Sequence, residues 1–101
     1  MSRPRIYCDF NKRYDRLTYG LNTVGTAADV ARLGLRLTPA LEVTLYDHDT
    51  LEDGSPAWLL AEGVVVELPG GALAAKVDDA TFRWEPRAEE GGEELGARTA
   101  V

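Results

Sequence analysis

Cysteine, histidine and methionine each occur only once in this chain of 101 residues. The single cysteine, Cys8, excludes a disulfide within the chain and is typical of a protein in a reducing compartment. With His48 as the single histidine, a transition-metal site would need carboxylates for most of its ligands. No apolar run approaches the roughly 20 residues of a membrane-spanning helix, and the charged start MSRPRIYCDF does not resemble a signal peptide. The sequence therefore predicts a cytoplasmic protein without membrane contact.

Basic residues are scarce in the larger part of the chain. Residues 1–36 hold seven basic and three acidic side chains, whereas residues 37–101 hold four basic and fourteen acidic ones. The net charge of −6 argues against non-specific binding to nucleic acid or anionic membranes, because phosphate contacts supply most of that affinity. The two regions of opposite charge can attract each other within one fold, or between two copies in a homodimer.

Two apolar runs dominate the middle of the chain, Leu41–Leu68. The first run reads LEVTLYDHD and the second reads AWLLAEGVVVEL, and the acidic turn TLEDGSP separates them. The first run alternates, which places Val43 and Leu45 on the inward face. The second, Trp58–Leu68, is apolar on both faces except at Glu62 and Glu67, and we expect a central strand with a bulge at Gly63. The two runs should form the central hairpin of the core.

Shorter strands are expected before this hairpin. Arg5–Phe10 alternates, with Ile6 and Cys8 on its inward face, which is typical of a half-buried strand. The polar stretch Asn11–Arg16 should form a hairpin turn, from which Leu17–Leu21 returns as a second strand.

Two further strands are expected after the central hairpin. A tight turn at Leu68–Gly71 leads into Ala72–Val77, which is rich in small residues. Thr81–Glu85 then completes the fold, with Phe82 and Trp84 on the inward face.

One short helix interrupts the strands. Thr26 is placed to cap its N-terminus, and Asp29 lies three residues further on, where a capping box has its carboxylate. Gly34 is a natural residue to end the helix after about two turns. Leu35–Leu41 is then a connector, and Pro39 keeps it out of a central strand.

These elements predict a mainly β fold with one short α-helix. Short and numerous strands usually curl into a small barrel, which removes exposed edges. We therefore expect an SH3-like or related small β-barrel in a single domain, residues 1–86. Residues 87–101 are rich in Gly and Glu and have no apolar periodicity, so we expect a disordered acidic tail.

The blocks IYCDFN, NTVGTAADV, VTLYDHD, EGVVVE and AAKVD, which span residues 5–85, resemble a group of small uncharacterised bacterial proteins. These blocks match strand edges, a capped helix and turns, so the resemblance implies a common fold and brings no activity. ARLGLRLTPALEVTLYD is similar, at the level of the fold, to the small SH3-like ferrous-iron-transport accessory domain. This chain has Ala40 where that domain favours glycine, and its long N-terminal extension differs.

Titratable side chains crowd together in one loop, at Asp47, His48, Asp49 and Asp53. As metal ligands they would make the protein a metal- or small-ligand-responsive accessory domain that uses loop 47–53. A calcium loop that begins at Asp49 would have leucines at its third and twelfth positions, where oxygen ligands belong. We therefore expect a solvated acidic turn without a metal, in which the two flanking aspartates favour the charged form of the histidine.

Three basic side chains lie near three tyrosines in the N-terminal region. The residues are Lys12, Arg13, Arg16, Tyr7, Tyr14 and Tyr19. Cations mixed with aromatic rings suit single-stranded nucleic acid, which gives a nucleic-acid-associated module as an alternative function. The acidic remainder of the chain opposes that function, and we expect the tip of a solvated hairpin.

No motif in the sequence carries a catalytic mechanism, so we expect neither an enzyme nor a cofactor. Cys8 lies on a core face, where thiols are usually inert, and nothing brings it to His48. Glu62 lies in an apolar strand, where burial would raise its pKa, unless the bulge at Gly63 turns it to solvent. The leading hypothesis is a non-enzymatic protein-interaction or accessory module that docks a protein partner, or a second copy, through an edge or groove.

Overall fold

The computed structural model describes residues 3–87. As the sequence predicts, this part of the chain is mainly β with one α-helix. Within the described residues, no helix has the length and apolar character needed to cross a membrane. The strands are β1 (Arg5–Tyr7), β2 (Arg13–Asp15), β3 (Thr18–Gly20), β4 (Glu42–Thr50), β5 (Pro56–Glu67), β6 (Leu73–Val77) and β7 (Arg83–Pro86), the helix is α1 (Val24–Leu33), and a 3-10 turn is η1 (Asp79–Thr81).

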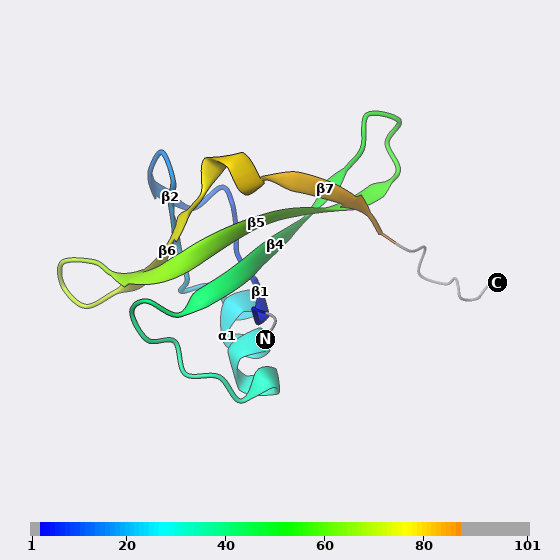
Figure 1. Ribbon diagram of the computed structural model, residues 1–101. Coiled ribbons are helices and arrows are strands. Elements are labelled where there is room, and N and C mark those ends of the chain that lie inside the picture. The colour runs from blue at the N-terminus through cyan, green and yellow to red at the C-terminus, as the bar shows by residue number, and fades with distance from the viewer. Residues whose placement is uncertain (1–2, 88–101) are drawn as a thin grey trace.

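The sheet is organised around strand β5, which is twelve residues long and pairs along both edges. One edge pairs with β4 from Glu42↔Val64 to Thr50↔Pro56, which confirms the predicted central hairpin. The other edge pairs first with β7 and then with β6. Beyond these, β4 pairs in parallel with β1, and β6 carries β3 and then β2 (Figure 1).

The predicted bulge at Gly63 is wrong. Gly63 pairs in register with Val43 on one side and with Val77 on the other. A Cβ atom at this position would lie 3.0 Å from the carbonyl oxygen of Lys76. Glycine therefore allows β5 and β6 to approach closely without a bulge.

The N-terminal strands do not form the hairpin that the sequence predicts. The first strand ends at Tyr7 and pairs with β4, far along the chain. The expected turn at 11–16 contains β2, and the expected returning strand is β3, which pairs with β2 and β6. The long-range pairing places Ile6 beside its register partner Leu45, and burial of both side chains favours it over a local hairpin.

The sheet is open, so the predicted closed barrel is wrong. Closure would require β1 and β2, the two ends of the strand order, to pair with each other, and they do not. Side chains of α1 occupy the free edge of β1 instead. The Oγ1 of Thr26 donates to the carbonyl of Tyr7 at 2.7 Å, and Oδ2 of Asp29 accepts from the Tyr7 amide at 2.9 Å. These two side chains replace a neighbouring strand and satisfy backbone groups that would otherwise be left without partners.

The helix begins earlier than predicted. Its N-cap is Thr23, whose Oγ1 accepts from the amide of Thr26 at 3.1 Å. The predicted capping box of Thr26 and Asp29 is therefore wrong, because both residues lie inside the helix, where they are buried and serve β1. Gly34 ends the helix in the left-handed conformation, with a φ of 63°, as the sequence predicts.

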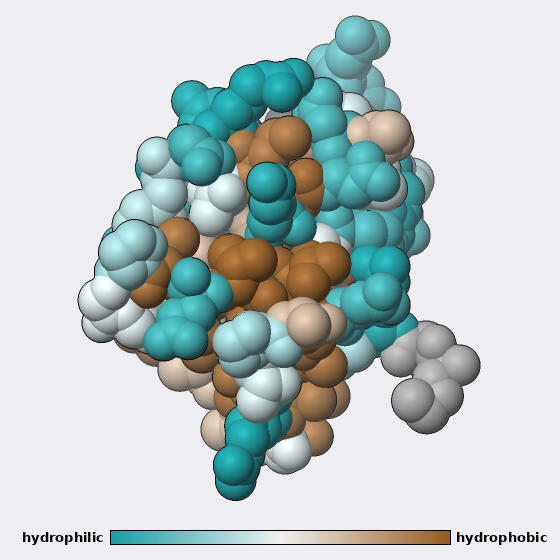
Figure 2. All heavy atoms as spheres, turned by 60° about the vertical axis from the view of Figure 1, so that its left-hand side comes forward, coloured by the Kyte–Doolittle hydropathy of each residue, from teal (hydrophilic) through white to brown (hydrophobic). Residues whose placement is uncertain are grey.

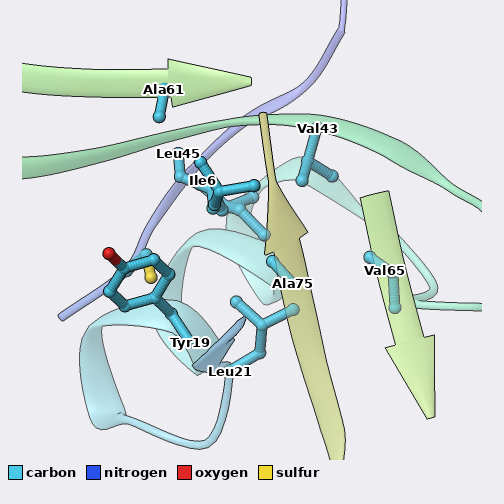
Figure 3. Close-up of a cluster of buried hydrophobic side chains, with 10 residues drawn as sticks. Ile6, Tyr19, Leu21, Val43, Leu45, Ala61, Val65 and Ala75 are labelled. Carbon is cyan, nitrogen blue, oxygen red and sulfur yellow. The ribbon is translucent and has the colours of Figure 1, made fainter. Parts of the chain in front are cut away.

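The core gathers side chains from strands that are distant in sequence. Figure 3 shows Ile6, Val43 and Leu45 together with Tyr19 and Leu21. Both predicted inward residues of β4 are fully buried. Other apolar side chains pack against this cluster while partly exposed, and Figure 2 shows apolar atoms on one face framed by hydrophilic ones. The partly buried ones are Phe10, Leu35, Leu37, Leu41, Leu73 and Phe82.

The connector between α1 and β4 contains a strained turn. The amide of Leu41 donates to the carbonyl of Thr38 at 3.1 Å, with Pro39 and Ala40 between them. Ala40 has a φ of 76°, in the left-handed region that disfavours a Cβ atom. Proline at the second position and a positive φ at the third are the marks of a type II turn, which favours glycine at the third position.

Replacing Ala40 with glycine should stabilise the fold by roughly 1 kcal/mol. Relief of the left-handed strain, about 1–2 kcal/mol, exceeds the entropy that glycine adds to the unfolded chain, about 0.4–1 kcal/mol. Urea denaturation measures the change. Ala72→Gly is the matched control, because Ala72 has no positive φ and should only lose stability. Equal effects of the two substitutions would contradict the strain at Ala40.

Replacing Thr26 with valine should destabilise the fold by about 1–3 kcal/mol, because it keeps the shape and leaves the carbonyl of Tyr7 without its donor. Thr23→Ala removes the cap and the hydroxyl beside Thr26, and should cost about 1 kcal/mol. The two hydroxyls are 2.8 Å apart, so the effects should not add in the double variant. An unchanged urea midpoint for Thr26→Val would show that the edge of β1 does not depend on α1.

Candidate functional site

Both tryptophans lie outside the core cluster, on a part of the sheet that extends beyond it. We call this part the arm, and define it as residues 47–60, which are the end of β4, the turn and the start of β5, together with β7. Figure 1 shows the hairpin of the arm projecting from the body of the protein, with β7 alongside. A tryptophan outside the core presents a large apolar surface at which a partner can bind.

Trp84 is 53% exposed, so the prediction that it faces the core is wrong. The register is the reason, because Trp84 pairs with Leu59 beyond the end of the core cluster. Its indole Nε1 donates to Oδ2 of Asp49 at 2.8 Å. This hydrogen bond fixes the orientation of the exposed ring and holds the pKa of Asp49 below its usual range.

Trp84 forms one wall of a groove of about 450 Å³. Asp49, Thr50, Leu51 and Glu52 line the rest of it. Residues 47–55 contain four carboxylates and no lysine or arginine. Within residues 3–87, neither Asp49 nor Glu52 forms an ion pair. The groove therefore combines an aromatic and aliphatic wall with an acidic rim that is not neutralised.

The four candidate metal ligands are held apart. Asp47, His48 and Asp49 lie on β4, not in the predicted loop, because β4 continues to Thr50, and Asp53 lies in the turn. In the described part of the chain, no three His, Cys, Asp or Glu side chains meet where they could hold a metal ion. Each carboxylate instead accepts a hydrogen bond, from the amide of Phe10 for Asp47, the indole of Trp84 for Asp49 and the amide of Ser55 for Asp53.

Trp58 points to the opposite face of the arm, since it precedes Leu59, the register partner of Trp84. Its ring packs edge-on against Tyr46, with the centroids 5.3 Å apart, and lies 5.1 Å from that of His48. The guanidinium carbon of Arg87 lies 4.9 Å from the Trp58 ring centroid. The chain itself therefore covers Trp58, whereas it leaves Trp84 open.

A second groove, of about 370 Å³, lies beside Trp58 and is lined by Arg5 and Arg32. Arg5 pairs with Glu85 at 3.4 Å, and Arg32 pairs with Asp29 at 3.0 Å. The last turn of α1 adds a partial negative charge at this place. Since both guanidinium groups already have carboxylate partners, this groove offers a ligand no cation that lacks a counter-charge.

Glu62 is half-buried, and its carboxylate receives a hydrogen bond from Thr44 at 2.7 Å and ion pairs from Arg83 at 2.9 Å and Arg3 at 3.5 Å. Burial acts to raise its pKa, but the hydrogen bond and the guanidinium groups outweigh it and hold the pKa below its usual range. The expected rise in pKa is therefore wrong, and no bulge turns the side chain to solvent. Glu62 therefore forms ion pairs that join β5 to Arg83 of β7 and to Arg3.

Cys8 is fully buried in the core cluster, as the sequence predicts. Burial raises its pKa to about 12, and the charge of Asp47 adds to the effect. A thiol with such a pKa supplies almost no thiolate at neutral pH. Cys8 is therefore a packing residue.

The basic cluster of the N-terminal region is divided by the fold. Arg16 pairs with a carboxylate of η1 at 3.4 Å, and Tyr19 is buried in the core. Lys12, Arg13 and Tyr14 remain together along a groove of about 260 Å³, and Tyr14 is 54% exposed. One exposed tyrosine does not make the row of stacking rings that single-stranded nucleic acid requires.

Glu62→Gln should destabilise the fold by roughly 1 kcal/mol at neutral pH, because the partly exposed guanidinium partners lose their counter-charge. A carboxyl whose pKa is lowered on folding stabilises the protein above its unfolded pKa and loses that effect as pH falls through the folded pKa. The difference between the native and variant proteins should therefore shrink as pH falls below about 4. Urea melts from pH 7 to pH 3 measure it, with the exposed Glu67→Gln as a control that should change little. A difference that does not depend on pH would contradict the ionic role.

Comparison with known proteins gives no relative from which to transfer a function. No protein-family model, no curated protein and no solved structure matches this chain. The chemistry of its own side chains is therefore the basis for a function.

Proposed function

We propose that this protein is a non-enzymatic interaction module whose Trp84 groove binds a lysine- or arginine-bearing segment of a protein partner. The observation that carries the proposal is the exposed indole of Trp84, held by Asp49 at the edge of an acidic groove. Such a module acts in the cytoplasm, where a lone buried cysteine stays reduced.

The groove has the chemistry that recognises a cationic side chain. The face of a tryptophan ring attracts an ammonium or guanidinium group, and Arg and Trp are frequent anchors in protein interfaces. The carboxylate of Glu52 lines the same groove and has no cationic partner within residues 3–87. The apolar wall formed by Leu51 accommodates the aliphatic stem of the same lysine or arginine.

The indole of Trp84 is already ordered before a partner arrives. The hydrogen bond to Asp49 joins β7 to β4 across β5, so the ring does not lose as much rotational freedom on binding. On the opposite face, Trp58 packs against the chain and stiffens the arm. The arm is therefore a preorganised surface with one tryptophan for support and one for recognition.

Fluorescence titration with hexa-arginine tests this function. In Trp58→Phe protein, Trp84 is the one remaining tryptophan, and its emission should change saturably with hexa-arginine and not with hexaglutamate. Glu52→Lys in this background should weaken binding about tenfold, because it places a cation in the rim of the groove. Glu67→Lys makes the same change in net charge at the other end of β5 and should weaken binding much less.

The second part of the test is Trp84→Ala in the native chain. Calorimetry should show loss of hexa-arginine binding, while the free energy of unfolding stays within about 1 kcal/mol because the ring lies outside the core. Equal losses of affinity in Glu52→Lys and Glu67→Lys would show that net charge binds the peptide. No saturable change at all would refute the proposed function.

A further inference from the structure

We infer that a second copy of this chain is a partner for the Trp84 groove, and that it enters with the basic β2–β3 hairpin at Lys12, Arg13 and Tyr14. This inference rests on the proposed function, because it uses the same groove. The cationic segment that enters the groove then comes from the chain itself.

The charges left without partners by the fold point to this pairing. Arg3, Arg5, Arg16, Arg32 and Arg83 each form an ion pair with a carboxylate. In the described part of the chain, no ion pair involves the two cations at the start of the β2–β3 hairpin or the three carboxylates nearest the tip of the arm. These residues are Lys12, Arg13, Asp49, Glu52 and Asp53.

The exposed aromatic rings accompany the same two sets of charges. Tyr14 is 54% exposed and lines the groove with Lys12 and Arg13, whereas Trp84 is 53% exposed and lines the groove with Asp49 and Glu52. Aromatic residues and arginine are enriched in protein interfaces. Each surface therefore pairs one exposed ring with charges of one sign, and the signs are opposite.

These two surfaces cannot meet within one copy. Figure 1 shows β2 and the tip of the hairpin between β4 and β5 on opposite sides of the protein. Contact between the hairpin of one copy and the arm of another is head-to-tail, because it joins two different patches. Its charges lie near the surface, so the association depends on ionic strength.

Sedimentation velocity of the full chain, over a range of protein and salt concentrations, tests the inference. Variants with exchanged charges are compared with the native chain. The native chain should associate at about 0.05 M NaCl and dissociate at about 1 M, where the Debye length falls to about 3 Å. Lys12→Glu with Arg13→Glu should weaken association at least about tenfold, and Glu52→Lys with Asp53→Lys should do the same. An equimolar mixture of these two double variants should associate again, because each altered surface meets its altered complement.

Arg36→Glu with Lys76→Glu is the matched control, since both residues are exposed and neither forms an ion pair within residues 3–87. Its net charge equals that of the hairpin variant, and it should associate like the native chain if the contact is local. A chain that stays monomeric at 0.05 M NaCl yet binds hexa-arginine would overturn this inference and leave the proposed function standing. Association that persists at 1 M NaCl, or a mixture that stays monomeric, would also overturn the inference, the former in favour of the apolar face seen in Figure 2.

Discussion

The carboxylate of Asp29 joins three parts of the chain that are far apart in sequence. It accepts hydrogen bonds from the amide of Tyr7, the hydroxyl of Tyr46 and the guanidinium of Arg32. Burial acts to raise its pKa, but these donors outweigh it and hold the pKa below the usual range. A ten-residue helix is too short to persist alone, and β1 has only three residues. Together with Thr26, this contact fixes the helix at the edge of β1, and each element stabilises the other.

The helix at this edge determines where the sheet ends on the β1 side. Side chains of α1 occupy the free edge of β1, and the sheet stays open. The hairpin of β4 and β5 extends past the core cluster. A two-stranded ribbon is marginally stable in water, and β7 supplies the third strand. The side chains around Trp58 then cover one face of this ribbon. On the other face, Trp84 stays 53% exposed, so the ring of Trp58 supports the arm while the ring of Trp84 is open to solvent.

Local patterns in the sequence predict the central hairpin, the inward positions of Val43 and Leu45, the buried Cys8 and the end of the helix at Gly34. These features depend on alternation, burial and backbone conformation within a few residues. The parallel pairing of β1 with β4 depends on a strand more than thirty residues away, and no local pattern contains it. The same limit applies to Thr26 and Asp29. Their residue types suit a capping box and equally suit hydrogen bonds to the backbone of β1. The alternation of Trp84 with charged residues indicates an inward face, but only its pairing with Leu59 shows that the core ends before it.

The distribution of ion pairs supports the proposal that recognition occurs at the ends of the molecule. Across its middle, arginines and carboxylates from different strands neutralise one another, as Arg83 and Glu62 do at 2.9 Å. Charges of one sign that remain together repel each other and destabilise the compact state slightly. Such charges remain at the arm tip and at the start of the β2–β3 hairpin, where Lys12 and Arg13 line one groove. Each place also exposes an aromatic ring, at Trp84 and at Tyr14. An oppositely charged partner removes the repulsion and covers the ring in the same step, so a contact at either end gains from both terms. Folding alone supplies neither gain, because the fold holds these two surfaces apart.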